Sequence, residues 1–224
     1  MKFKLTVIFL LVLIFGANAQ SVTYDNTSYG DDIRTVILQK AISIYDPLPL
    51  IALGSSEKLR LSFDILSPNN EFFNYTYIHC DRNWQESSLQ QMEYISGKLM
   101  GDIVDFKFST NTYQRFTHYA LNFPEKDMEI TKSGNYILKI YRNFDLEDVV
   151  LTRRFMVLDR HTSISTNIRS ATDPEYRFTH QEVDFSVNYE GFTIPNPFLD
   201  VNVTVLQNNS WNNAIYNLKP LFVN

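Results

Sequence analysis

The sequence predicts an all-β fold: an antiparallel β-sandwich of the immunoglobulin-like kind, followed by a second β domain. Three observations support this prediction. The chain contains at least seven short stretches in which apolar and polar residues alternate, it has no long stretch with a helical period, and its turn signals recur about every 10 residues. Alternation places every second side chain on the same face, so each stretch can form a strand that buries one face.

The N-terminus predicts export from the cytoplasm. Lysines occupy positions 2 and 4, residues 5–15 are an apolar run in which Thr6 is the one polar residue, and Ala17-Asn18-Ala19 has the small-x-small pattern of a cleavage site. This arrangement is typical of a secretory signal peptide, which we assign to residues 1–19. A membrane-spanning helix requires roughly 20 apolar residues, which is more than this run provides. The residue directly after the cleavage site is Gln20 and not a cysteine, so we expect no lipid anchor at the new N-terminus.

The composition limits the classes of partner. The formal net charge is −5, and removal of Lys2 and Lys4 with the signal peptide makes it more negative. A moderately acidic protein has no electrostatic reason to bind nucleic acid or an anionic lipid surface. The 17 Phe and 13 Tyr residues supply core volume for one or two domains. Cys80 is the only cysteine, so no intrachain disulfide can form.

The first domain is predicted over residues 33–158, after a polar arm at residues 20–32 that we expect to be flexible. Residues 33–40 alternate as a first strand, and Asp46-Pro47-Leu48-Pro49 interrupts it because proline lacks a backbone donor. Residues 59–65 show the clearest alternation, and the turn residues Ser67-Pro68-Asn69-Asn70 close that strand. Further strands are predicted around residues 106–108, 119–123, 136–140 and 151–158, the last two as a hairpin.

Residues 74–89, NYTYIHCDRNWQESSL, contain the densest run of unusual residue types. Strand alternation places Tyr75, Tyr77 and His79 on one face and Thr76, Ile78 and Cys80 on the other, before a polar break at residues 81–83. A serine at 87 or 88 with a glutamine three residues later is typical of a capping box. We therefore expect a short helix here, with Leu89 and Met92 facing inward.

The predicted domain boundary is Leu158-Asp159-Arg160-His161, and a second β domain is expected over residues 162–224. Its strands are predicted at residues 164–168, 183–189 and 199–205, where apolar residues again alternate with polar ones. Three or four strands cannot close a sandwich. We therefore expect an incomplete second domain with a sheet edge that needs a partner.

The sequence offers no catalytic constellation, so we expect no enzyme, no cofactor and no small-molecule substrate. His79 and Cys80 are consecutive in a strand and point to opposite faces, which prevents them from forming a nucleophile pair. Cys80 is instead expected to be buried and inert. The four histidines lie far apart without metal-ligand spacing, so no metal site is predicted.

Tyr75, Tyr77, Arg82 and Trp84 are the predicted partner-binding residues. Trp, Tyr and Arg supply most of the binding energy in protein interfaces, and here they lie close together in sequence. The same side chains could stack on sugars. Alternatively, Trp84 could fold back and cap the sandwich, and the sequence leaves these possibilities open.

Several separated stretches together resemble the plug protein family of the type IX secretion system. In the first domain they are Thr76-Tyr77-Ile78-His79-Cys80-Asp81 with Trp84-Gln85 and Ser87-Ser88-Leu89, then Ser133-Gly134-Asn135-Tyr136 and Leu151-Thr152-Arg153-Arg154-Phe155-Met156-Val157. In the second domain they are His180-Gln181-Glu182-Val183-Asp184-Phe185, Asn196-Pro197-Phe198 and Val205-Leu206-Gln207-Asn208. The resemblance extends from about Ile33 to Asn224, and chains of that family continue beyond the corresponding point.

This resemblance implies a non-enzymatic periplasmic protein, peripherally associated with the outer membrane and not inserted in it. Its implied partner is the outer-membrane translocon barrel, whose periplasmic opening it would seal. An alternative class is a periplasmic or secreted carbohydrate-binding β-sandwich module, which the aromatic residues around Trp84 suggest. Binding of glycans that depends on Trp84 would favour the alternative over the plug.

Overall fold

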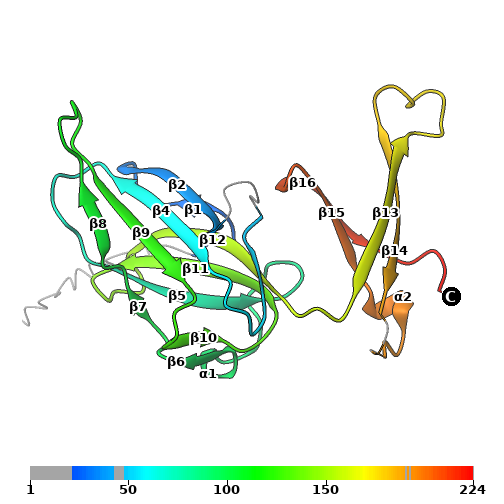
Figure 1. The fold of residues 1–224 in the computed structure, drawn as a ribbon, viewed down its shortest axis with the longest axis horizontal. Helices are drawn as coiled ribbons and strands as arrows, with labels where there is room; N and C mark the ends of the chain where they lie inside the picture. Colours follow the sequence, from blue (N-terminus) through cyan, green and yellow to red (C-terminus); the bar gives the residue numbers. More distant parts are fainter. Residues whose placement is uncertain (1–21, 43–47, 190, 192, 224) are drawn as a thin grey trace, which may run out of the picture.

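The structure, a computed structural model, describes residues 22–42, 48–189, 191 and 193–223. The predicted signal peptide at residues 1–19 lies outside the described residues. The chain forms two β domains side by side, and the molecule is elongated along the line that joins them (Figure 1). Its elements are almost entirely strands in antiparallel pairs, which confirms the predicted all-β class. None of the helices in the described ranges is long and apolar enough to cross a membrane.

The first domain is a sandwich of two sheets (Figure 1). A four-stranded sheet has the order β2-β4-β9-β8, and a six-stranded sheet has the order β1-β12-β11-β5-β7 with β3 added to β12 in parallel. The strands of the first sheet are β2 Ile33–Lys40, β4 Leu59–Ile65, β8 Asp105–Phe108 and β9 Thr117–Phe123. Those of the second are β1 Thr27–Ser28, β3 Leu50–Ala52, β5 Phe73–Cys80, β7 Gly101–Asp102, β11 Gly134–Arg142 and β12 Val149–Leu158.

The core lies between these two sheets. The four apolar side chains of β4 are all 0% exposed, so the strongest alternation in the sequence does mark the inward face. Aromatic rings join the sheets: the Phe123 ring on β9 lies 5.8 Å from that of Tyr77 on β5 and 5.2 Å from that of Phe155 on β12. Burial of each such side chain stabilises the fold by roughly 1.5–3 kcal/mol, so the inter-sheet core supplies most of the stability.

One open end of the sandwich is covered by a short helix and a two-stranded ribbon. The helix α1 spans Gln91–Tyr94, and β6 Ile95–Gly97 pairs with β10 Met128–Ile130. The capping box is formed by Gln90 and Glu93, not by serine and glutamine as expected. Met92, which was expected to face inward, is 75% exposed, and Tyr94 is buried instead. A helix this short has one inward position, and the shifted start gives that position to Tyr94.

The described part of the N-terminal arm lies along β12. Residues 27–28 pair with β12 as β1, the Thr152 hydroxyl donates to the Asp25 carbonyl at 2.7 Å, and the Arg154 amide donates to the Asn26 side chain at 2.8 Å. The polar residues of this arm take part in hydrogen bonds to β12. Residues 22–32 are therefore bound to the sandwich, which differs from the flexible arm that we expected.

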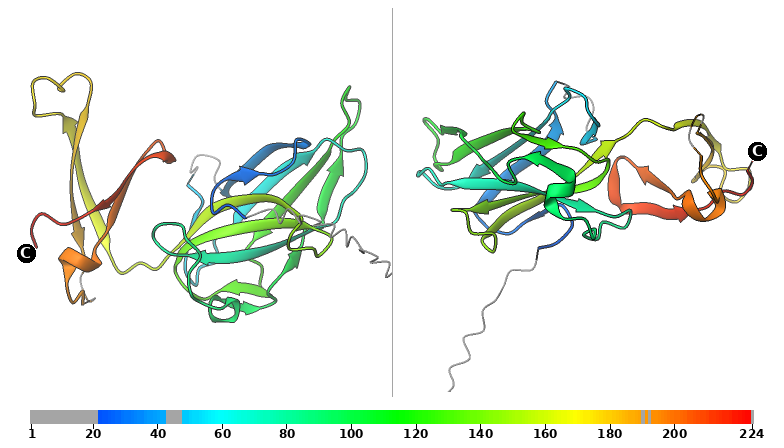
Figure 2. Two further views of the ribbon diagram at one scale, coloured as in Figure 1. Left: turned by 180° about the vertical axis from the view of Figure 1, so that it is seen from behind. Right: turned by 90° about the horizontal axis from the view of Figure 1, so that it is seen from below.

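The second domain consists of two separate antiparallel ribbons, visible from three sides in Figures 1 and 2. The strand β13 Ser163–Ser170 pairs with β14 Gln181–Asn188, and β15 Val203–Gln207 pairs with β16 Ser210–Leu218. A short helix, α2 Pro197–Asp200, precedes β15. Leu199 therefore lies in a helix and not in the strand predicted at residues 199–205, because Pro197 at the first helical turn starts a helix there.

Candidate functional site

Tyr75 and Tyr77, two of the four predicted partner-binding residues, lie in the core of the first domain. Both side chains are 0% exposed, and their rings lie 5.8 Å apart between the sheets. Burial raises the pKa of both phenols, so they stay neutral. Tyr75 and Tyr77 do lie on one face of β5, as the alternation predicted, but this face points into the core between the two sheets. They are therefore not part of an accessible patch in this structure.

Trp84 is also buried, at 2% exposed. It packs on Cys80 and Ile137, on the outer face of the six-stranded sheet. The guanidinium carbon of Arg154 lies 4.6 Å from the centroid of the Trp84 ring, in cation–π geometry. The structure thus agrees with the alternative that Trp84 folds back, although it covers the outer face of a sheet and not an open end. Of the four predicted residues only Arg82 is exposed.

The loop that places Trp84 is closed by Asp81. Its carboxylate accepts hydrogen bonds from the amides of Asn83 at 2.8 Å and Gln85 at 2.9 Å, while its carbonyl accepts one from the Asn135 side chain at 3.0 Å. Aspartate bonds of this kind are typical of tight turns. Trp84 adopts a φ of 62°, a left-handed conformation that is rare for a bulky residue. The loop is therefore tied to β11, and its shape turns the indole back onto the sheet.

His79 is fixed on the opposite side of β5. Its Nδ1 lies 2.8 Å from the Ser87 hydroxyl, and its Nε2 lies 3.3 Å from the Ser133 carbonyl. Gly134 has a φ of +148°, and a Cβ built on it would lie 2.6 Å from His79 Nε2. Glycine at this position therefore leaves the space that the imidazole occupies.

Cys80 points away from His79, as the alternation predicts, and packs beside Trp84. Burial raises the pKa of the Cys80 thiol to about 12, so it stays protonated at neutral pH. A protonated, buried thiol is not a nucleophile. The described residues also contain no group of three or more His, Cys, Asp or Glu side chains placed to hold a metal ion.

The first-domain stretches that resemble the plug family come together at one end of the six-stranded sheet. Residues 79–87 pack on residues 133–136, and Ile78, Ile137 and Arg154 lie side by side across β5, β11 and β12. We call the group Cys80, Trp84, Ile137 and Arg154 the outer-face cluster. Trp211 of the second domain also reaches it, with its ring 4.9 Å from that of Trp84. Sequence reasoning missed Arg154 and Trp211, although Trp211 is one of only two tryptophans.

Exposed apolar side chains lie in the loops beside the other end of β5. Phe72 is 70%, Val104 is 80% and Phe144 is 65% exposed. Hydrogen bonds hold their segments together: the Phe72 carbonyl accepts from Asn143 at 3.1 Å, and the Asn74 side chain accepts from the Phe144 amide at 2.8 Å. We call Phe72, Val104 and Phe144 the distal apolar surface. Exposed aromatic groups of this kind mark interaction sites more often than isolated apolar residues do.

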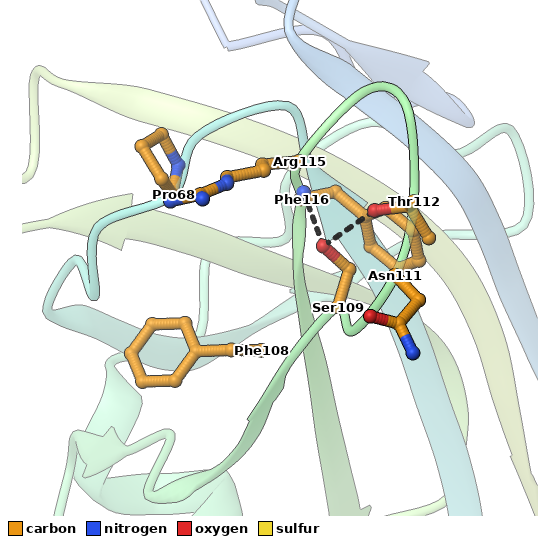
Figure 3. Close-up of a pocket in the computed structure, with 7 residues that line it drawn as sticks. All are labelled: Pro68, Phe108, Ser109, Asn111, Thr112, Arg115 and Phe116. Atoms are coloured by element: carbon orange, nitrogen blue, oxygen red, sulfur yellow. Dashed lines mark hydrogen bonds between the residues drawn. The ribbon is translucent and has the colours of Figure 1, made fainter.

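A shallow hollow lies at the turn between β8 and β9 (Figure 3). The Ser109 hydroxyl sits in it and accepts hydrogen bonds from the Phe116 amide and the Thr112 hydroxyl, both at 3.0 Å. These bonds close the turn, so the polar groups have a structural use. No residue of the lining is a carboxylate or a histidine that could act as an acid or base. The lining residues are Pro68, Phe108, Ser109, Asn111, Thr112, Arg115 and Phe116.

Comparisons with known proteins point to one family. The sequence profile of the type 9 secretion system plug protein 1st domain matches residues 33–159. A crystal structure of a hypothetical protein from Parabacteroides merdae matches with 29% sequence identity and a TM-score of 0.85. That match covers 91% of this chain, so it includes much of the second domain, and it covers 51% of the other chain. This chain therefore spans about half the length of that protein.

Other comparisons add nothing to this assignment. A structure of the Pseudomonas fluorescens alkylpurine DNA glycosylase AlkC, bound to DNA containing an abasic site analog, matches with 8% identity and a TM-score of 0.32. It covers 57% of this chain and 30% of the other, and so weak a likeness carries no argument about fold or function. No curated protein matches this chain.

Proposed function

The chain belongs to the type 9 secretion system plug protein family, and from that premise we propose that it is a non-enzymatic periplasmic component of this secretion system. In this proposal it associates with the outer-membrane translocon barrel and seals the periplasmic opening of that barrel. The observation that carries the proposal is the match of residues 33–159 to the first domain of plug proteins. The family itself indicates a role in the secretion machinery at the cell envelope.

The physical properties of the first domain suit a part that works by shape. A seal must resist deformation, and close-packed cores of interlocking aromatic rings have low compressibility. The centroid of the Phe155 ring lies 5.2 Å from that of Phe123 and 5.2 Å from that of Tyr136. Cys80 is buried and protonated, and both ring nitrogens of His79 have hydrogen-bond partners, the Ser87 hydroxyl and the Ser133 carbonyl. These residues support packing roles and not chemistry.

The distal apolar surface is the part of the first domain that we assign to the barrel. Phe72 and Phe144 are exposed aromatic residues on segments fixed by hydrogen bonds, so little conformational entropy is lost when they dock. Arg142 anchors the same segments, since its guanidinium bonds Glu71 at 2.9 Å and lies 3.4 Å from Asp148. Fixed aromatic side chains contribute strongly to protein interfaces.

The carbohydrate-binding alternative loses its basis in this structure. It depended on Trp84 as an exposed ring on which a sugar could stack, and Trp84 is 2% exposed. Tyr75 and Tyr77 are likewise inside the core. Among the exposed aromatic residues of the first domain, Phe72 and Phe144 lie beside the other end of β5, whereas Phe106, Phe108 and Tyr113 lie on β8 and the turn that follows it.

Affinity purification tests the proposed function. A tagged full-length protein, expressed in its native cells, should recover a large outer-membrane barrel protein from membranes solubilised in mild detergent. The Phe72→Ser/Phe144→Ser double variant should reduce that recovery at least tenfold. Met92→Ser is a matched control, because Met92 is also exposed but lies on α1, and it should leave recovery unchanged. Recovery of the tagged protein without any barrel protein would refute the proposal.

A further inference from the structure

The two domains meet at Trp211. It follows the turn between β15 and β16, where Asn208 and Asn209 adopt φ values of 54° and 57°. This turn points toward the first domain (Figure 1), and Trp211 packs against the outer-face cluster. The Trp211 ring lies edge-on to Trp84, with ring centroids 4.9 Å apart and planes at 80°. This is a favourable geometry for a pair of aromatic rings.

Arg154 joins both tryptophans. Its guanidinium carbon lies 4.6 Å from the Trp84 ring and 5.7 Å from the Trp211 ring. The guanidinium is held in place by first-domain groups: Nε donates to the Tyr24 carbonyl at 2.9 Å, and Nη1 lies 3.5 Å from the Asp25 carboxylate. The first domain thus presents a cation and an indole that are already fixed when Trp211 arrives.

A short linker joins the two domains. Residues 159–162, between β12 and β13, are exposed. Within the described part of the chain, the ring contacts that join the two domains all involve Trp211. An exposed linker of this kind permits rotation, so the orientation of the second domain depends on how firmly Trp211 is held.

One feature opposes this contact. The indole Nε1 of Trp84 is buried without a hydrogen-bond partner. A buried donor without an acceptor costs free energy that water would restore on opening. Aromatic and cation–π contacts favour the closed arrangement, and the unpaired N–H disfavours it. Because these terms act in opposite directions, the net free energy that holds the contact closed is smaller than the ring contacts alone would give.

We propose that Trp84, Arg154 and Trp211 form a reversible latch between the two domains. When the latch is closed, it sets the orientation of the second domain. When Trp211 leaves, the second domain turns about residues 159–162 while both domains keep their secondary structure. This proposal concerns the geometry of the chain itself, and its test does not involve the translocon.

Tryptophan fluorescence reports on the two rings of this latch, because Trp84 and Trp211 are the only tryptophans of the chain. The mature full chain should show a near-UV circular dichroism band from the coupled indoles, and iodide should quench their fluorescence weakly. In Trp211→Phe the remaining emission comes from Trp84 and should stay protected, since a ring still covers it. In Trp211→Ala iodide should quench Trp84 at least twice as strongly.

Distance measurements test the orientation directly. Dyes attached to Tyr113→Cys and Ser165→Cys report on the two domains, because both positions are exposed whereas Cys80 is 2% exposed and shielded from labelling. The wild-type latch should give one narrow distance distribution. Trp211→Ala should broaden it. Phe178→Ala, which removes an exposed aromatic ring of the second domain away from the latch, should leave it unchanged.

A second variant guards against misfolding of β16. Arg154→Gln removes the cation from the first-domain side, and it should broaden the same distribution. The double variant Arg154→Gln/Trp211→Ala should open no further than Trp211→Ala alone, because both changes remove one shared contact. Unchanged distances and unchanged iodide quenching in both single variants would overturn the latch.

Discussion

The two domains carry the same kind of sequence signal but use it differently. In β4 of the first domain all four alternating apolar side chains are 0% exposed. In β13 of the second domain Ile164 and Ile168 also alternate, yet they are 60% and 59% exposed. Register aligns Ile164 with Val187 and Ile168 with Val183, so the ribbon has one apolar face. Alternation therefore specifies a face, and only an opposing sheet makes that face a core.

The largest expected difference between the domains is in core substitutions. Phe155→Ala should destabilise the first domain by about 3–5 kcal/mol, because the ring is 0% exposed and packs against Tyr136, Phe123 and Tyr77. Ile168→Ala should change stability by less than about 1 kcal/mol, since the side chain is 59% exposed. Urea unfolding followed by circular dichroism measures both. Equal effects would mean that the β13–β14 ribbon is covered in solution.

Trp84 should behave as a core residue and not as a surface residue. Trp84→Ala should cost about 3 kcal/mol of unfolding free energy, because it removes a buried indole from the outer-face cluster. Arg82→Ala should stay within about 0.5 kcal/mol, since Arg82 is exposed. If Trp84 belonged to a surface patch, which is one of the possibilities that the sequence left open, both substitutions would spare stability. Thermal and urea unfolding of the two single variants separate these outcomes, and a neutral Trp84→Ala would restore the surface interpretation.

Gly134 should give an intermediate effect. Gly134→Ala places a Cβ where the His79 ring lies and adds a side chain at a φ of +148°. We expect a loss of about 1–3 kcal/mol, because backbone strain and displacement of His79 add together. The imidazole resonances of His79 should shift in NMR spectra of the variant. Wild-type stability and unshifted resonances would show that the ring moves aside without cost.

The same contrast explains what the sequence could predict. The strands at residues 33–40 and 59–65 were located to the residue, because their alternation is long and turn residues follow it. The strands β1, β3 and β7 were missed because they have only two or three residues. The face of β5 was also predicted correctly. That this face is interior depends on Phe123 and Phe155, which are distant in sequence, and local periodicity holds no information about such contacts.

The candidate site was harder to predict for the same reason. Trp84 was singled out by residue type, but its burial follows from the Asp81 turn and from Arg154 on a different strand. Its contact with Trp211 crosses a domain boundary. The resemblance to plug proteins is confirmed for the first domain, and the structure adds that the first-domain stretches build one packed unit. Residue types therefore indicated where to look, and tertiary contacts decided whether the side chains are accessible.

The smallest expected effect concerns the polar face of the β13–β14 ribbon. Arg169 lies 3.0 Å from the Asp184 carboxylate and 2.5 Å from that of Glu182, which also accepts a hydrogen bond from the Thr172 amide at 2.8 Å. The hydrogen bond from Arg169 is the main cause that lowers the Glu182 pKa from 4.5 to about 2. Because the folded-state pKa is depressed, the pair stabilises the ribbon above pH 4.5, and this stabilisation is lost as the pH falls toward 2.

Carbon-detected NMR titration of the Glu182 carboxyl measures that pKa in the intact chain. In Arg169→Gln the midpoint should rise toward 4.5, while Arg160→Gln, which changes a linker arginine, should leave it near 2. Solvent screens an exposed pair strongly, so the loss of Arg169 should barely change overall stability. A wild-type midpoint near 4.5 would mean that the two strands do not hold this register in solution. A depressed midpoint would instead show that β13 and β14 keep their pairing in solution, although the apolar face of the ribbon has no opposing sheet among the described residues. Strand pairing in this domain would then not depend on the formation of a core.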